Sequence, residues 1–92
     1  MKTIYKYVIK CRDSFVQILP QGAKVIAVQT QQGQPVFWAT VDTEQPPEPR
    51  EFFVVGTGHN FDAESKTFLG TFQLEEGTLI FHLFEPTRGI QS

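Results

Sequence analysis

The chain has 92 residues, of which 40% are hydrophobic and 20% are charged, and its net charge is −2. This length supports one domain with one core, and the slightly negative charge excludes a protein that attracts nucleic acid through its overall field. The single cysteine, Cys11, excludes an intrachain disulfide and offers no metal-ligand spacing. We therefore expect a single domain over residues 1–92, with no metal, no cofactor and no nucleic-acid partner.

Residues 1–11 alternate apolar and charged side chains, unlike the apolar segment of a signal peptide. No apolar run approaches the roughly 20 residues that a membrane-spanning helix needs. A small domain without a disulfide is typical of a reducing compartment. We expect a cytoplasmic protein that does not contact a membrane.

Apolar side chains recur mostly with a period of two, which predicts strands. The first strand, for example, places Tyr5, Tyr7 and Ile9 on one face. The second ends at the turn signal Pro20-Gln21-Gly22. The predicted strands are 3–11, 15–19, 24–30, 35–41, 51–55, 67–74 and 78–85.

The segments between the predicted strands also contain sequences that are typical of turns and loops. QQGQ (31–34) and EEG (75–77) predict tight hairpins, and DAESK (62–66) predicts one helical turn capped by Asp62. The proline-rich segment 42–51 predicts a stiff surface loop, because consecutive prolines disfavour helix and central strand. The tail 86–92 is typical of a frayed, flexible end.

These features predict a mainly β fold, with about seven short antiparallel strands in a meander and at most one short helical turn. The meander is expected to curl into a barrel or to fold as a sandwich, and the sequence leaves both open. Strands 35–41 and 51–55 are apolar on both faces. We therefore expect a homo-oligomer, which would cover the second face.

Four cations and no acid occur in the first twelve residues. Lys2, Lys6, Lys10 and Arg12 all have even numbers, so an extended strand would align them in one basic stripe. Such a stripe is either a solvated edge that resists aggregation or a surface that binds anions. Both interpretations stay open.

The segment VVGTGHNFD (54–62) runs from a predicted strand into Gly56-Thr57-Gly58-His59. Glycines there let backbone N–H groups converge on an anion, while Thr57 adds a hydroxyl and His59 a proton carrier. The pattern matches neither established phosphate-loop motif, and the alternative is a bend that requires a positive φ. Either a ligand loop or a simple corner is expected.

His82 and Trp38 are further candidates. His82 lies in an apolar strand, where it is either a hydrogen-bonded core residue or a site residue that needs a partner across the sheet. Trp38 either packs in the core or a subunit interface, or stacks on a ring of a ligand, as Tyr7 also could. No local signature of nucleophilic catalysis or of a perturbed acid pair is present, so we expect no enzyme. A small phosphohydrolase that uses His59 with Asp62 is the minor alternative.

Five segments, in this order, carry a family resemblance: MKTIYKY (1–7), LPQGAKVIAVQTQQGQPVFWATVD (19–42), VVGTGHNFD (54–62), FLGTFQ (68–73) and LIFHLFE (79–85). With them the chain resembles a family of short, functionally uncharacterised proteins encoded in phage and prophage genomes. That family usually has leucine where this chain has Thr40, and proline where it has Asn60.

The resemblance implies a phage accessory protein that acts in the cytoplasm of an infected bacterium. It favours the ligand-loop interpretation of the Gly-Thr-Gly-His block, which is among the family's most recognisable features. We expect a non-catalytic protein that sequesters an anionic nucleotide-type molecule to counter host defence. The alternative is a protein–protein inhibitor or assembly module that binds a host protein. The expected ligand-binding residues are Gly56, Thr57, Gly58, His59, Trp38, Lys6, Tyr7 and His82.

Overall fold

Seven strands and two short 3-10 turns make up the part of the chain that the computed structural model describes, residues 1–87. The prediction of a mainly β protein with seven antiparallel strands is confirmed. The strands are β1 (Lys2–Val8), β2 (Ser14–Pro20), β3 (Lys24–Gln31), β4 (Gln34–Asp42), β5 (Pro47–Gly56), β6 (Lys66–Leu74) and β7 (Leu79–Pro86). The 3-10 turns are η1 (Ala63–Ser65) and η2 (Glu75–Gly77).

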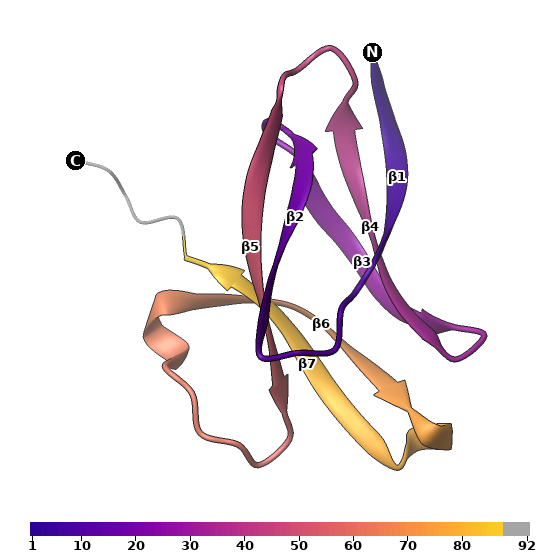
Figure 1. The fold of residues 1–92 in the computed structure, drawn as a ribbon, viewed down its shortest axis with the longest axis vertical. Helices are drawn as coiled ribbons and strands as arrows, with labels where there is room; N and C mark the ends of the chain where they lie inside the picture. The colour runs from indigo at the N-terminus through magenta and orange to yellow at the C-terminus, as the bar shows by residue number, and fades with distance from the viewer. Residues whose placement is uncertain (88–92) are drawn as a thin grey trace.

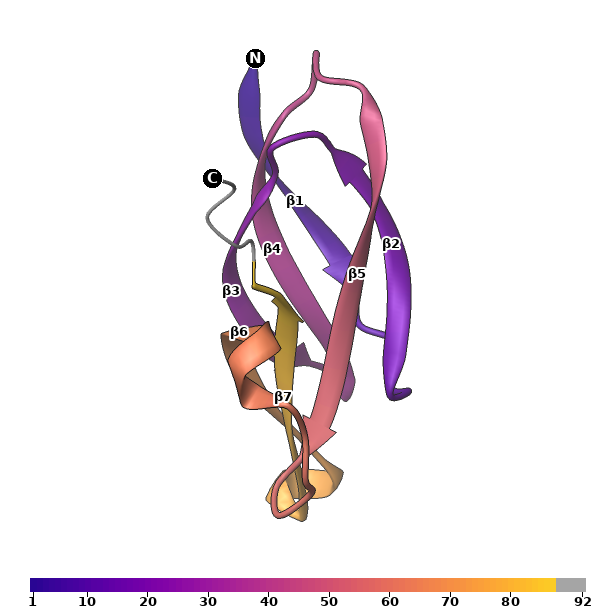
Figure 2. The same cartoon turned by 90° about the vertical axis from the view of Figure 1, so that its left-hand side faces the viewer.

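The strands form two sheets that pack face to face. One has the order β1-β4-β3 and the other the order β2-β5-β7-β6. Figure 2 shows β2 and β5 on one side of the molecule and β1, β4 and β3 on the other. On one flank β3 and β6 lie next to each other, whereas β1 and β2 are the outermost strands of the other flank (Figure 1). The fold is therefore an open sandwich and not a closed barrel.

Aromatic rings from alternate strand positions fill the space between the sheets. Phe37 of β4 and Phe52 of β5 are fully buried, and their ring centroids lie 5.0 Å apart. Phe15 of β2 stacks on Phe52 at 5.4 Å. Each ring removes about 150–250 Å² from water, so these contacts are a large part of the stability. They also fix which face of each strand points inward.

Residues 42–51, expected to form a surface loop, contain the start of a strand, because β5 begins at Pro47. The prolines are tolerated there because β7 pairs only with residues 53–56 of β5. Pro47 and Pro49 pair with β2 alone, so the missing proline N–H has no partner to lose on the β7 side.

The first strand is shorter than predicted and ends at Val8. Lys2 and Lys6 lie on one face of it, as the alternation predicts. Lys10 and Arg12 lie in the following connection, where the Arg12 N–H donates to the Lys10 carbonyl at 2.9 Å. The predicted stripe of four cations is thus split between a strand and a turn.

The other connections agree with their sequence signals. Asp62 caps η1 by accepting from the Glu64 N–H at 3.3 Å. The QQGQ hairpin turns through Gln32 and Gly33, both with positive φ. The predicted flexible tail, 86–92, begins in residues that the structure describes: Pro86 ends β7, and the Thr87 N–H donates to the Ser65 carbonyl at 2.9 Å. Its remaining residues, 88–92, lie outside the described residues. Within residues 1–87, no helix has the length and apolarity to cross a membrane.

Candidate functional site

The Gly-Thr-Gly-His segment is a tight β-turn at the end of β5. The His59 N–H donates to the Gly56 carbonyl at 3.0 Å, and Gly58 has a φ of +88°. A glycine with positive φ in the third position is the signature of a type II turn. The Thr57 N–H donates to the Ile80 carbonyl of β7 at 3.1 Å. Because Thr57 and His59 use their N–H groups inside the protein, those two groups do not cradle an anion.

Gly56 makes room for the His59 ring. A Cβ on Gly56 would lie 3.0 Å from Cε1 of His59. Gly56 occupies the same face of β5 as the buried residues Phe52 and Val54, so the imidazole covers the inner end of the strand. The first glycine and the histidine therefore depend on each other through packing.

His82 is half-buried on β7 and is held by two threonine hydroxyls. Its Nε2 lies 2.8 Å from Thr57 Oγ1, and its Nδ1 lies 2.9 Å from Thr71 Oγ1. Thr57 Oγ1 also donates to the Ile80 carbonyl at 3.3 Å. A hydroxyl has one proton, so all three contacts are satisfied together when Thr57 accepts from an Nε2–H and Thr71 donates to Nδ1. This bonding defines one neutral tautomer of His82.

The two histidines do not share a site. His82 pairs with Val55, whose side chain points to the outer face of the sheet, whereas the His59 ring covers the inner position at Gly56. Successive residues of a strand point to opposite faces, so the sheet lies between the rings. His59 lines two pockets of about 300 and 360 Å³, the first with Phe53 and Lys66 and the second with Thr57 and Phe81.

Lys6 and Trp38 are brought together on the outer face of the three-stranded sheet. They lie directly opposite each other in the pairing of β1 with β4. Lys6 Nζ donates to Gln31 Oε1 of β3 at 2.8 Å, so the lysine side chain crosses over the central strand β4. Trp38 is half-buried beneath this region.

The same outer face continues into an apolar hollow. The next outward pair along the two strands is Ile4 with Thr40. With Lys2 and Thr3 they line a hollow of about 540 Å³, and the Ile4 side chain is 54% exposed. Ile4 therefore lies between two outward lysines, Lys2 and Lys6. This face combines cations, an aromatic ring and accessible apolar surface.

Tyr7 lies on the opposite, inner face of β1. Its ring stacks on that of Phe37, with the centroids 5.2 Å apart. Burial raises the pKa of Tyr7, and charge repulsion from the nearby Tyr5 raises it further. The eight expected residues thus separate into three groups: the Lys6–Trp38 pair, the inward Tyr7, and the turn with His82.

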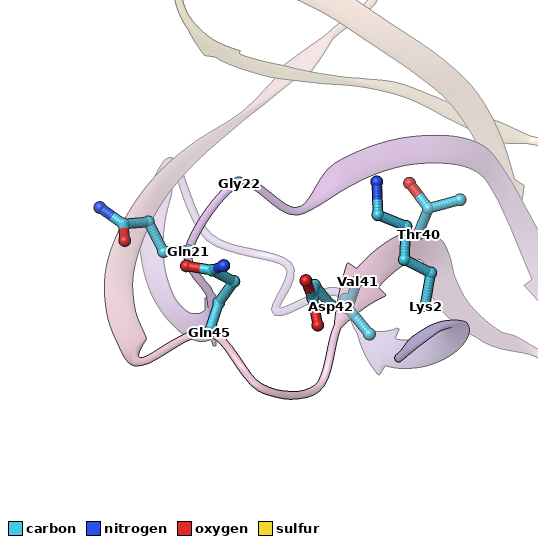
Figure 3. Close-up of a pocket in the computed structure, with 7 residues that line it drawn as sticks. All are labelled: Lys2, Gln21, Gly22, Thr40, Val41, Asp42 and Gln45. Carbon is cyan, nitrogen blue, oxygen red and sulfur yellow. The ribbon is translucent and has the colours of Figure 1, made fainter.

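A further polar pocket of about 310 Å³ lies at the start of β1 (Figure 3). Figure 3 shows Gln21 and Gln45 on one side, Lys2 with Thr40 on the other, and Asp42 between them. The Glu44 N–H and the Met1 ammonium donate to the Asp42 carboxylate and lower its pKa. These contacts join Asp42, the last residue of β4, to the N-terminus and to the turn that follows the strand.

Sequence reasoning did not identify Thr71, the second partner of His82. The pairing of Thr71 with His82 depends on a bulge in β6 between Phe68 and Gly70, and no short sequence motif predicts that bulge. Across the described residues 1–87, no group of three or more His, Cys, Asp or Glu side chains is placed to hold a metal ion.

Comparison with known proteins assigns the chain to a family. A family model described as "Domain of unknown function (DUF7352)" matches residues 1–92, so the chain belongs to the DUF7352 family. No curated protein and no solved structure matches the chain.

Proposed function

We propose that this member of the DUF7352 family is a non-catalytic binding protein that captures an anionic, nucleotide-type small molecule. The observation that carries the proposal is the direct pairing of Lys6 with Trp38 beside the apolar hollow at Ile4 and Thr40. An aromatic face stacks on a nucleobase, and an ammonium group attracts a phosphate.

Charge on this face favours an anionic ligand. Lys2, Lys6 and Lys24 all take outward positions, Lys24 through its pairing with Thr40. Asp42 also lies at this end of the sheet, but the Met1 ammonium pairs with it at 3.1 Å. The local balance is therefore positive on a chain whose net charge is −2.

Binding is favoured over turnover by the environment of His82. Both of its ring nitrogens bond to threonine hydroxyls. A general base needs a free nitrogen within reach of a substrate proton. The role of the captured molecule is proposed from the resemblance to phage-encoded proteins: sequestration of a host defence signal in the bacterial cytoplasm.

Within one subunit the turn at Gly56–His59 is remote from this site, so it contributes to binding only if the ligand also contacts a second subunit. The turn lies at the end of the molecule opposite the N-terminus (Figure 1). His82 faces outward on the other sheet, as its partner Val55 does. A ligand that used both groups would bridge two subunits of the homo-oligomer that the sequence leads us to expect. The stoichiometry of ligand per subunit distinguishes these arrangements.

Native mass spectrometry with a panel of cyclic and ADP-ribose-type nucleotides tests the proposal. Trp38→Leu is expected to weaken binding by about 1–3 kcal/mol, the range for loss of one stacking aromatic. Lys6→Gln should weaken it as well, while Lys10→Gln, an exposed lysine beyond the end of β1, is the matched control. Loss of binding in His59→Ala but not in Trp38→Leu would move the site to the turn. Failure of the whole panel to bind would contradict the proposal.

A further inference from the structure

The strand β1 has one side that no strand of the described chain occupies, because it ends the order β1-β4-β3. The backbone bonds show which residues face that side. The Ile9 N–H donates to Pro35, and the Met1 carbonyl accepts from Thr43, both at 2.9 Å. Odd-numbered residues therefore bond to β4. The N–H and C=O groups of Lys2, Ile4, Lys6 and Val8 point to the free edge.

Four cations lie on β1 or in the connection that follows it: Lys2, Lys6, Lys10 and Arg12, all of them exposed. The Lys6 ammonium reaches across β4 to Gln31, so this side chain has to turn back to meet a strand added at the edge. Within residues 1–87, none of the four takes part in an ion pair. Residues 1–12 contain no acid. The edge thus presents a row of backbone donors and acceptors in a positive field.

Apolar surface at the edge is left uncovered. Ile4 and Val8 are 54% and 48% exposed on the outer face. Tyr5 shares the inner face with Tyr7 and yet remains 43% exposed, because β1 has no strand beyond it to extend the cover. A strand added at this edge would bury part of all three side chains.

A second copy of β1 is a poor occupant. Antiparallel pairing of two β1 strands about Ile4 would place Lys2 opposite Lys6 twice, and like charges directly opposite each other destabilise a sheet. Pairing about Tyr5 places the lysines opposite Val8 and Ile4, but it still brings together two segments that each carry four cations and no acid. The same lysines attract a strand with acidic side chains. Charge complementarity thus favours a partner strand with acidic side chains over a second copy of β1.

We propose that the free edge of β1 takes up an extended acidic segment of a partner protein as an additional strand. Backbone hydrogen bonds to the even-numbered residues hold the segment, and its acidic side chains face the lysines. Lys2 and Lys6 take part in both proposals, but the peptide uses the free backbone edge of β1, whereas the nucleotide ligand proposed above uses the face of β4 at Trp38.

A synthetic peptide of about eight alternating Glu and Val residues, roughly the length of a strand, is the probe. Titration followed by fluorescence anisotropy should show binding that weakens as salt rises, because the side chains involved are exposed. The same peptide with Lys in place of Glu should not bind. Equal binding of both peptides overturns the proposal.

Ile4→Pro tests the edge directly, because it removes an N–H that points to solvent and leaves the bonds to β4 in place. Ile4→Thr is the matched control, since it loses apolar surface but keeps the N–H. We expect Ile4→Pro to weaken peptide binding about tenfold relative to Ile4→Thr, equivalent to about 1.4 kcal/mol. Equal affinities of the two variants would show that the edge is not used.

Hydrogen exchange on the wild-type protein gives a readout that does not depend on a variant's folding. Bound peptide should slow exchange of the Ile4, Lys6 and Val8 amides and leave those of Tyr5 and Tyr7 unchanged. Uniform slowing, or none, contradicts edge pairing. Self-association that Ile4→Pro abolishes, without uptake of the peptide, would assign the edge to a second copy and overturn the proposal.

Discussion

Gly70 of β6 lies so close to Val28 of β3 that a Cβ on Gly70 would be 2.6 Å from both Cβ and Cγ2 of the valine. The contact lies on the flank where the two sheets meet. Nearby, the Thr30 hydroxyl of β3 donates to the Gln73 carbonyl of β6 at 2.6 Å. The close approach of β3 and β6 therefore depends on a missing side chain.

Gly70→Ala is expected to lower the free energy of unfolding by about 1–3 kcal/mol, the usual cost of forcing a methyl group into a packed contact. Urea denaturation measures the change. The clashing valine atoms include its Cβ, which cannot swing aside. In the double variant Gly70→Ala/Val28→Gly, which removes the Cβ of residue 28 as well, the cost should thus be smaller than the sum of the single costs. Strict additivity would show that the valine is not the obstacle.

The ion pair between Arg50 and Glu85 is the second stability determinant. Arg50 Nη2 lies 2.9 Å from Glu85 Oε1, and its Nη1 donates to the Ala23 carbonyl at 2.9 Å. The two side chains are 9% and 20% exposed. Arg50 therefore connects β5 with β7 and with the residue that precedes β3.

Glu85→Gln should destabilise the protein by about 3 kcal/mol, because it leaves a buried guanidinium without its counter-charge. The double variant Arg50→Met/Glu85→Leu should recover much of that loss, since neither charge is then buried alone. Thermal unfolding of the three proteins measures both effects. A double variant as unstable as Glu85→Gln would contradict this electrostatic account.

The strands were predictable because period-two alternation is a local signal, as in Tyr5, Tyr7 and Ile9. Which strands are neighbours was not, because the contact of Gly70 with Val28 joins residues from different sheets. The prediction of a loop at the prolines was wrong for a related reason. Pro47 and Pro49 are compatible with a strand only because β7 does not reach them, and that depends on tertiary structure.

Part of the candidate site could be predicted from the alternation of side chains along a strand. The outward position of Lys6 with Lys2 follows from the alternation, but its pairing with Trp38 needs the register of β1 on β4. His59 and His82 looked alike in the sequence. The structure gives them different neighbours, because one follows a strand end at Gly56 and the other lies within β7.

The bonding of His82 predicts its tautomer. The arrangement that satisfies every contact has Thr57 donating to the Ile80 carbonyl and accepting from Nε2–H, so we expect Nδ1 to be the unprotonated nitrogen of the uncharged ring. Long-range ¹H–¹⁵N NMR spectra distinguish the two ring nitrogens. A dominant Nδ1–H form in the wild-type protein would contradict the network.

Thr57→Val removes the acceptor with little change in volume, so the Nε2–H loses its partner. We expect this variant to lower stability by about 1 kcal/mol, the usual contribution of one hydrogen bond, and to shift the tautomer balance toward Nδ1–H. Thr57→Ser keeps the hydroxyl and should retain the wild-type spectrum. If Thr57→Ser shifted the balance as far as Thr57→Val, the methyl group and not the hydrogen bond would control the ring.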